Sequence, residues 1–352
     1  MATQRTMVDA LLERETRQMS ITRDDVKVSG SPTRLNAVWR QKVIHWYFTL
    51  VTALRRQHSA AAESTSGGNN PFCRISVHVT ASLLDNYLMS LPSERALRYK
   101  HDRPAYQLLA TTCLLLGMRL AQHDQIKEAS LREAADQHQG GEELQGGLKR
   151  AKTHRTKMNE VSAPMATSTT PLVAATGVAI PNAATILRIS AAPKSISEQH
   201  ILSMVREMTG SRSFPRSKVV TPLDFIHVTC ATSSHVSEDG SSISLGPDDV
   251  EEACRLADAS LRDASFSGQR PSVVACAVIT LALARSNSVS LSMASLRREV
   301  YHSIFGTKDD PVLQASIRET ESNLLRSIHI GVPSSRNRHV VPTTHLIPLE
   351  DE

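Results

Sequence analysis

The side chains that most often carry chemistry are spread through this chain without the spacings that catalysis or metal binding requires. Its five cysteines lie far apart with no CxxC or CxxH pair, and its 14 histidines include no HExxH motif. The chain contains no GxSxG sequence, no Gly-rich phosphate loop and no pair of acids in an apolar setting. We therefore expect no enzyme activity, no metal site and no cofactor.

The composition favours a helical protein that works inside the cell. Hydrophobic residues make up 40% of the 352 residues but aromatic residues only 4%, so the cores must be built from Leu, Ile, Val and Ala, two of which favour helix. The net charge of +5 is mixed along the chain, which argues against direct nucleic-acid binding. A charged N-terminus predicts no signal peptide, and the absence of any apolar run of about 20 residues predicts no membrane span. Scattered cysteines fit buried thiols in a reducing compartment.

Apolar residues recur at helical spacing through most of the chain. This spacing predicts an N-terminal amphipathic helix and then three longer helices, over residues 5–19, 37–56, 75–89 and 104–122. The last of these is apolar on nearly every face, which is typical of a central helix. Beyond residue 194 the pattern predicts six more helical segments, which begin near residues 195, 221, 248, 271, 292 and 310.

Two segments interrupt or follow these helices. Residues 126–194 begin with a polar, Gly-rich stretch and continue with small residues interrupted by prolines, a composition that predicts a flexible insertion. Residues 331–352 are predicted to form a polar tail. The basic cluster 148–157 is typical either of a nuclear-import signal, which would place the protein in nucleus and cytoplasm, or of a solvated loop. Ser31 and Thr170 each precede a proline and are candidate phosphorylation sites, although such dipeptides are common.

Three ordered motifs carry the functional signal of the chain. Arg40 and Trp46 begin the helix RQKVIHWYFTLVTAL, Asp85 lies in SLLDNYL, and YQLLATTCLLLGMRLA follows at 106–121. Their order resembles the cyclin box, a helical module that binds and activates a protein kinase, and the pattern is most similar to D-type cyclins. The later segments SISEQHILSM, VVTPLDFI and LADASLRDASFSGQRPSVVACAVITLALA are similar to the corresponding parts of that family.

The resemblance implies an all-α protein with two tandem five-helix folds. It places an N-terminal helix and linker first, then a cyclin box split by the insertion, then a second fold and the tail, at 1–36, 37–125 plus 195–215, 126–194, 216–330 and 331–352. It also implies that Arg40, Trp46 and Asp85 mark the fold, with Asp85 tying helices together by hydrogen bonds.

The same resemblance implies a regulatory subunit whose partner is the catalytic subunit of a cyclin-dependent kinase. The kinase would be contacted by Arg119, which stands where the family has a lysine, with Leu116, Leu202 and Val205 beside it. Val205 occupies the position of a family glutamate, and Glu207 is expected to point to another side of its helix.

A second implied surface would dock short Arg-x-Leu peptides of kinase substrates or inhibitors on the first long helix. The matching positions are Trp39, Val43, Trp46 and Gln107, with Lys42 and Thr49 in place of an apolar and an acidic residue. Those two replacements predict weak or altered docking.

Two other functions stay open from the sequence. A general transcription factor with the same double fold would be expected to carry a stronger basic surface, and often an N-terminal zinc ribbon. A degenerate cyclin fold that scaffolds something other than a kinase is favoured by Val205.

Overall fold

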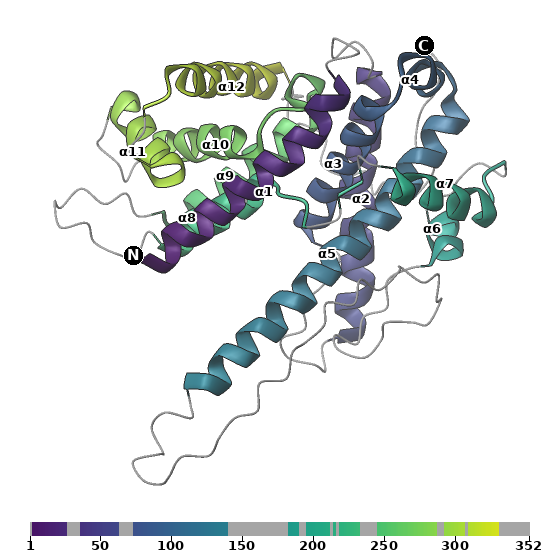
Figure 1. Cartoon of the computed structure of the whole chain (residues 1–352), viewed down its shortest axis with the longest axis horizontal. Helices are drawn as coiled ribbons and strands as arrows, with labels where there is room; N and C mark the ends of the chain where they lie inside the picture. Colours follow the sequence, from purple (N-terminus) through teal and green to yellow (C-terminus); the bar gives the residue numbers. More distant parts are fainter. Residues whose placement is uncertain are drawn as a thin grey trace, which may run out of the picture.

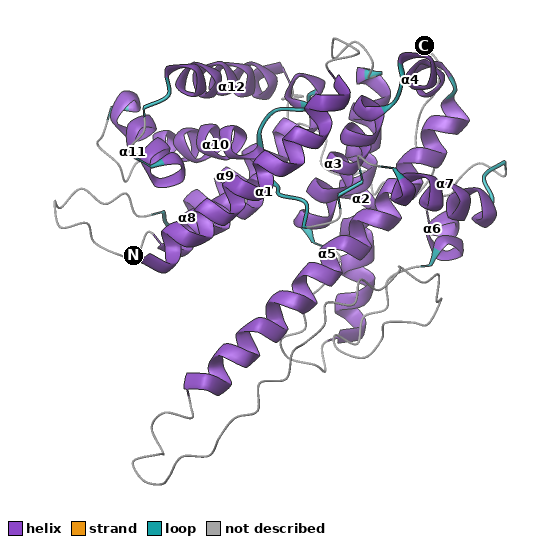
Figure 2. Ribbon diagram, viewed as in Figure 1, coloured by secondary structure: helices purple, strands orange, loops and turns teal. Residues whose placement is uncertain are grey.

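The computed structural model describes residues 2–26, 36–62, 73–139, 182–189, 195–211, 214–215, 218–232, 245–286, 292–306 and 309–330. Within these ranges the regular structure is helical and no strand occurs, which confirms the all-α prediction (Figure 2). In the same ranges, no helix is long and apolar enough to cross a membrane.

The first core is formed by the six helices that follow the N-terminal one. These are α2 (Ala37–Ala62), α3 (Arg74–Ser90), α4 (Ser93–His101), α5 (Arg103–Gln139), α6 (Ala183–Ile189) and α7 (Glu198–Gly210). The central element is α5, which packs against α3, α4, α6 and α7. Its residues Leu109, Cys113 and Leu114 are fully buried, as expected of a segment that is apolar on nearly every face.

The second core is formed by five helices, of which α10 is the central one. They are α8 (Pro222–Thr232), α9 (Pro247–Arg262), α10 (Pro271–Arg285), α11 (Met293–Phe305) and α12 (Pro311–Ile330), with a short 3-10 helix at Ala264–Phe266. Every residue from Pro271 to Leu283 is buried, and Pro271 stands at the start of α10, where its missing N–H costs nothing. Figure 1 shows α8–α12 on one side of the molecule and α2–α7 on the other.

The N-terminal helix α1 (Ala2–Val26) packs on both groups, against α8 and α10 of the second and α3 of the first. Its Leu11 belongs to the second core. Glu15 is fully buried and accepts hydrogen bonds from the Ser272 backbone N–H (2.6 Å) and hydroxyl (2.8 Å) and from Arg270. A carboxylate therefore caps the N-terminus of α10, where the helix dipole favours negative charge.

Two parts of the predicted insertion 126–194 are helical instead. The helix α5 continues to Gln139, and α6 adds Ala183 and Ile186 to the first core at 3% and 0% exposure. The local signal for α6 is Asn182, whose side chain accepts a hydrogen bond from the Thr185 N–H at 2.8 Å, as a helix N-cap does. Seven residues are too few for an apolar period to stand out in the sequence. The remainder of the insertion, 140–181 and 190–194, lies outside the described residues.

Candidate protein-binding face

Arg40 and Asp85 form a buried joint between the two groups of helices. Arg40 is 1% exposed and donates from Nε and Nη2 to the two Asp85 carboxylate oxygens, at 2.9 and 2.7 Å. Its Nη1 donates to the backbone carbonyl of Leu261, in the last turn of α9, at 2.5 Å. Burial by itself lowers the pKa of Arg40, but attraction and hydrogen bonding by Asp85 outweigh it and the pKa is raised. Both residues are structural, and neither is available to a partner.

A second polar joint links α3 to α9. Arg74 contacts Glu251 at 2.8 Å and Asp258 at 2.9 Å, and the other Asp258 oxygen lies 3.0 Å from Nε2 of the buried His78. The two joints therefore connect α2 and α3 of the first group to α9 of the second group.

Arg119 lies on α5 and is exposed, with no hydrogen bond or ion pair within the part of the chain that the structure describes. Partial shielding from water lowers the pKa of its guanidinium, and no nearby acid offsets that effect. An unsatisfied cation with several fixed donors is suited to a carbonyl or carboxylate of another molecule. Leu116, predicted to join it, is 4% exposed and belongs to the first core, so little of its side chain is accessible to a partner.

The helix α7 adds the apolar part of the same candidate surface. It begins at Ser197, whose side chain accepts from the His200 N–H, and it buries one face through Ile201, Met204 and Met208. On the other side Leu202 is 37% exposed and Val205 is half-buried at the edge of the core. The helix α7 packs against α5, the helix on which Arg119 lies.

Glu207 is committed to another side of α7. Its Oε1 accepts from the Tyr87 hydroxyl at 2.8 Å and from Arg95 at 2.5 Å. Burial and this hydrogen bond raise the pKa of Tyr87 well above its ordinary value. Glu207 therefore faces α3 and α4 and not the side of α7 on which Val205 lies, as its place on the helix predicted.

The four residues predicted to dock substrate peptides do not form an open apolar patch. Val43 is 0% exposed, Gln107 2% and Trp46 8%, because all three face the first core. Only Trp39 is partly exposed, with its ring centroid 5.6 Å from that of the buried Tyr106. Core packing explains why Trp39, Val43 and Trp46 are apolar, and the helical period could not separate that role from docking.

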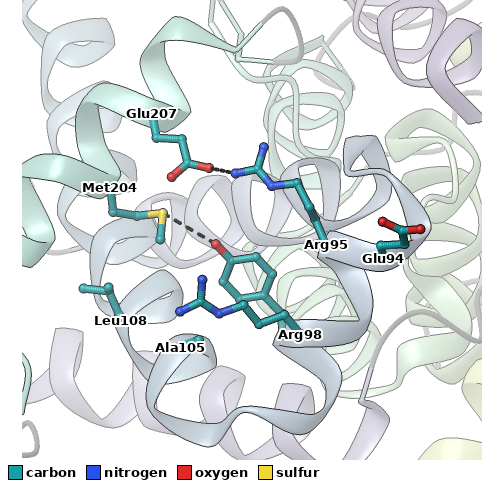
Figure 3. A pocket seen from close by; sticks show the side chains of 8 residues that line it. Glu94, Arg95, Arg98, Ala105, Leu108, Met204 and Glu207 are labelled. Atoms are coloured by element: carbon teal, nitrogen blue, oxygen red, sulfur yellow. Dashed lines mark hydrogen bonds and ion pairs between the residues drawn. The ribbon is translucent and has the colours of Figure 1, made fainter.

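A pocket of about 280 Å³ lies between α4, α5 and α7 (Figure 3). Sequence reasoning missed this pocket because it did not predict α4, whose nine residues are too few for an apolar period to repeat. A signal was nevertheless present: Glu94 in the first turn and three basic residues in the last turn are typical of helix ends. Its lining residues are Glu94, Arg95, Arg98, Tyr99, Ala105, Leu108, Met204 and Glu207.

Three of the predicted features cannot be placed in this fold. Ser31, Thr170 and the basic cluster 148–157 lie outside the described residues. Where the structure is described, no cluster of three or more His, Cys, Asp or Glu could hold a metal ion. No protein-family model matches the chain, and no curated protein matches its sequence.

Proposed function

We propose that this chain is a cyclin-like regulatory subunit that binds the catalytic subunit of a cyclin-dependent kinase and controls its activity during cell division, in the nucleus and cytoplasm. The observation that carries the proposal is Arg119 on α5, which is exposed and has no hydrogen bond or ion pair among the described residues. The resemblance of the motifs around Arg40, Asp85 and 106–121 to the cyclin box supports the same assignment.

Such a subunit performs no chemistry of its own. It stabilises the active conformation of a kinase by binding that conformation more tightly than the inactive one. The guanidinium of Arg119 would donate to carbonyl or carboxylate oxygens of the kinase, while Leu202 and Val205 would bury apolar surface against it. The Arg40 and Arg74 joints connect the two groups of helices, and such preformed contacts would reduce the cost of ordering the subunit on binding.

The proposal is tested by measuring binding of the full chain to a panel of purified cyclin-dependent kinase catalytic subunits, together with kinase activity. Arg119→Glu replaces a donor by a repelling charge and is expected to weaken binding at least tenfold, which is about 1.4 kcal/mol. Arg318→Glu, an exposed residue of α12, is the matched control and should bind as the unmodified chain does. Val205→Glu restores the carboxylate of the family pattern and should tighten binding.

A folded preparation that neither binds nor activates any of these kinases would refute the proposal. Equal affinities for Arg119→Glu and Arg318→Glu would refute the placement of the surface. Val205 favours a second function, a cyclin-like scaffold with another protein partner, and failure of all kinases to bind would support it. Salt-dependent binding to duplex DNA would instead indicate the transcription-factor alternative.

A further inference from the structure

The pocket between α4, α5 and α7 combines an apolar floor with a charged rim. Its floor is formed by Tyr99, Ala105, Leu108 and Met204, of which Tyr99 and Ala105 are 6% and 7% exposed and the Tyr99 hydroxyl lies 3.9 Å from the Met204 sulfur. A cavity of about 150 Å³ already holds a benzene molecule. The volume of about 280 Å³ therefore admits one large aliphatic or aromatic side chain.

The rim differs from a phosphate site in its charge balance. It carries two arginines and two glutamates, so the formal charges of Glu94, Arg95, Arg98 and Glu207 cancel. Glu207 is held by Arg95 and by Tyr87 and closes one wall. A doubly charged phosphate would meet both carboxylates without a surplus of positive charge, and such a ligand is disfavoured.

Arg98 is the one rim cation that holds no hydrogen bond within the described residues. Its side chain is 71% exposed, and its Nε lies 3.6 Å from Oδ2 of Asp102, which is too long for a hydrogen bond. In Figure 3 the Arg98 guanidinium extends toward the side of the pocket where Leu108 lies, while Glu94 lies on the opposite side. The free end of a guanidinium therefore stands beside the apolar floor. The exposed Leu97 adds further apolar surface on the same helix.

We propose that this pocket binds a segment of a partner protein in which a large apolar side chain stands next to a carboxylate. The apolar side chain enters the floor between Leu108 and Met204, and the carboxylate pairs with Arg98. This site is separate from Arg119 and does not depend on the partner of the α5 and α7 surface. It gives the chain an apolar docking site in a place other than the buried positions Val43 and Gln107.

The test follows the Met204 methyl group by NMR in the full chain labelled with ¹³C-methyl methionine, with the signal assigned by its loss in Met204→Leu. Three synthetic peptides in Gly-Ser flanks are titrated: Leu-Glu-Glu, Ala-Glu-Glu and Leu-Lys-Lys. The first is expected to shift the Met204 signal saturably, and each of the others to bind at least fivefold more weakly. Arg98→Glu should reverse the preference, so that Leu-Lys-Lys binds more tightly than Leu-Glu-Glu.

Arg206→Glu, at an exposed position of α7 that does not line the pocket, is the control and should leave all three titrations unchanged. Arg98→Glu changes a largely exposed side chain, so the helical circular dichroism of the variant should match that of the parent. Absence of a saturable Met204 shift with Leu-Glu-Glu would overturn the proposal, as would the same peptide preference in Arg98→Glu and the parent. Kinase binding should be unaffected by Arg98→Glu, which separates this result from the test of Arg119.

Discussion

Removing the Asp85 carboxylate is expected to destabilise the first group of helices more than any surface change. Asp85→Ala leaves the Arg40 guanidinium, 1% exposed, without the two oxygens at 2.9 and 2.7 Å that neutralise it. Its remaining bond to the Leu261 carbonyl carries no counter-charge. Breaking a buried ion pair by removing one partner costs about 3–5 kcal/mol. That cost is a large share of the roughly 5–15 kcal/mol by which most domains are stable.

The double variant Arg40→Met with Asp85→Leu should recover most of this loss. It removes both charges, so no uncompensated group stays buried, and replacement of a buried pair by apolar residues is often neutral. The expected residual cost is about 1–3 kcal/mol, because the Leu261 carbonyl loses its donor. The single variants Arg40→Met and Asp85→Leu and the double variant therefore form a double-mutant cycle. We expect it to show a large coupling free energy between the two side chains.

Urea unfolding followed by tryptophan fluorescence measures these effects directly. The chain has two tryptophans, Trp39 and Trp46, and both lie on α2 against the first core. With a slope of about 2 kcal/mol per molar urea, a loss of about 4 kcal/mol lowers the midpoint by about 2 M. A loss below about 1 kcal/mol for Asp85→Ala would contradict the buried pair. A double variant whose cost equals the sum of the two single costs would contradict the coupling.

Two further substitutions test the packing of α1 and α5. Glu15→Gln keeps the shape of the cap on α10 but removes its charge, so it should lower the free energy of unfolding, measured by heat or urea, by about 1–3 kcal/mol. The matched control Glu13→Gln, at an exposed position, should change it by no more than about 0.5 kcal/mol. Equal losses in the two variants would show that the charge of the cap does not contribute. Gly117→Ala places a methyl group 2.1 Å from the Thr80 hydroxyl oxygen and 2.9 Å from the Thr80 Cα, so it should cost at least about 1–3 kcal/mol by overpacking. Gly210→Ala meets no atom within 4 Å and should not destabilise; a Gly117→Ala protein as stable as Gly210→Ala would refute the close approach of α3 and α5.

Long helices were predictable from the sequence and short ones were not. The segments around 37–56, 75–89 and 104–122 have enough turns for an apolar face to repeat, and the structure has α2, α3 and α5 there. The helices α4 and α6 have nine and seven residues, so their apolar faces repeat too few times to be recognised. The division of the chain into two folds was expected from the family resemblance and not from the helical period. Beyond α1, the buried residues change from the first core to the second between Val219 and Val220.

The sequence predicted the role of a site residue where that role is to join helices, and not where it requires exposure at a surface. Asp85 was expected to join helices, and its bonds to Arg40 agree with that expectation. Three residues predicted to lie on binding surfaces are buried instead: Val43 on α2, and Gln107 and Leu116 on α5. Sequence periodicity does not distinguish a buried position from a surface position one helical turn away. The kinase-binding role of Arg119 stays a prediction.

By itself, the sequence of this protein determined where the longer helices begin, and it contains no HExxH, CxxC or GxSxG motif. These properties depend on neighbours within about four residues along the chain. The tertiary structure alone decided the pairings: Arg40 with a carbonyl 221 residues away, Glu15 with the start of α10, and Glu207 with Tyr87 and Arg95. Those choices depend on which helix ends and faces meet when two cores close, and residues so distant in the chain leave no local pattern by which to recognise their partners.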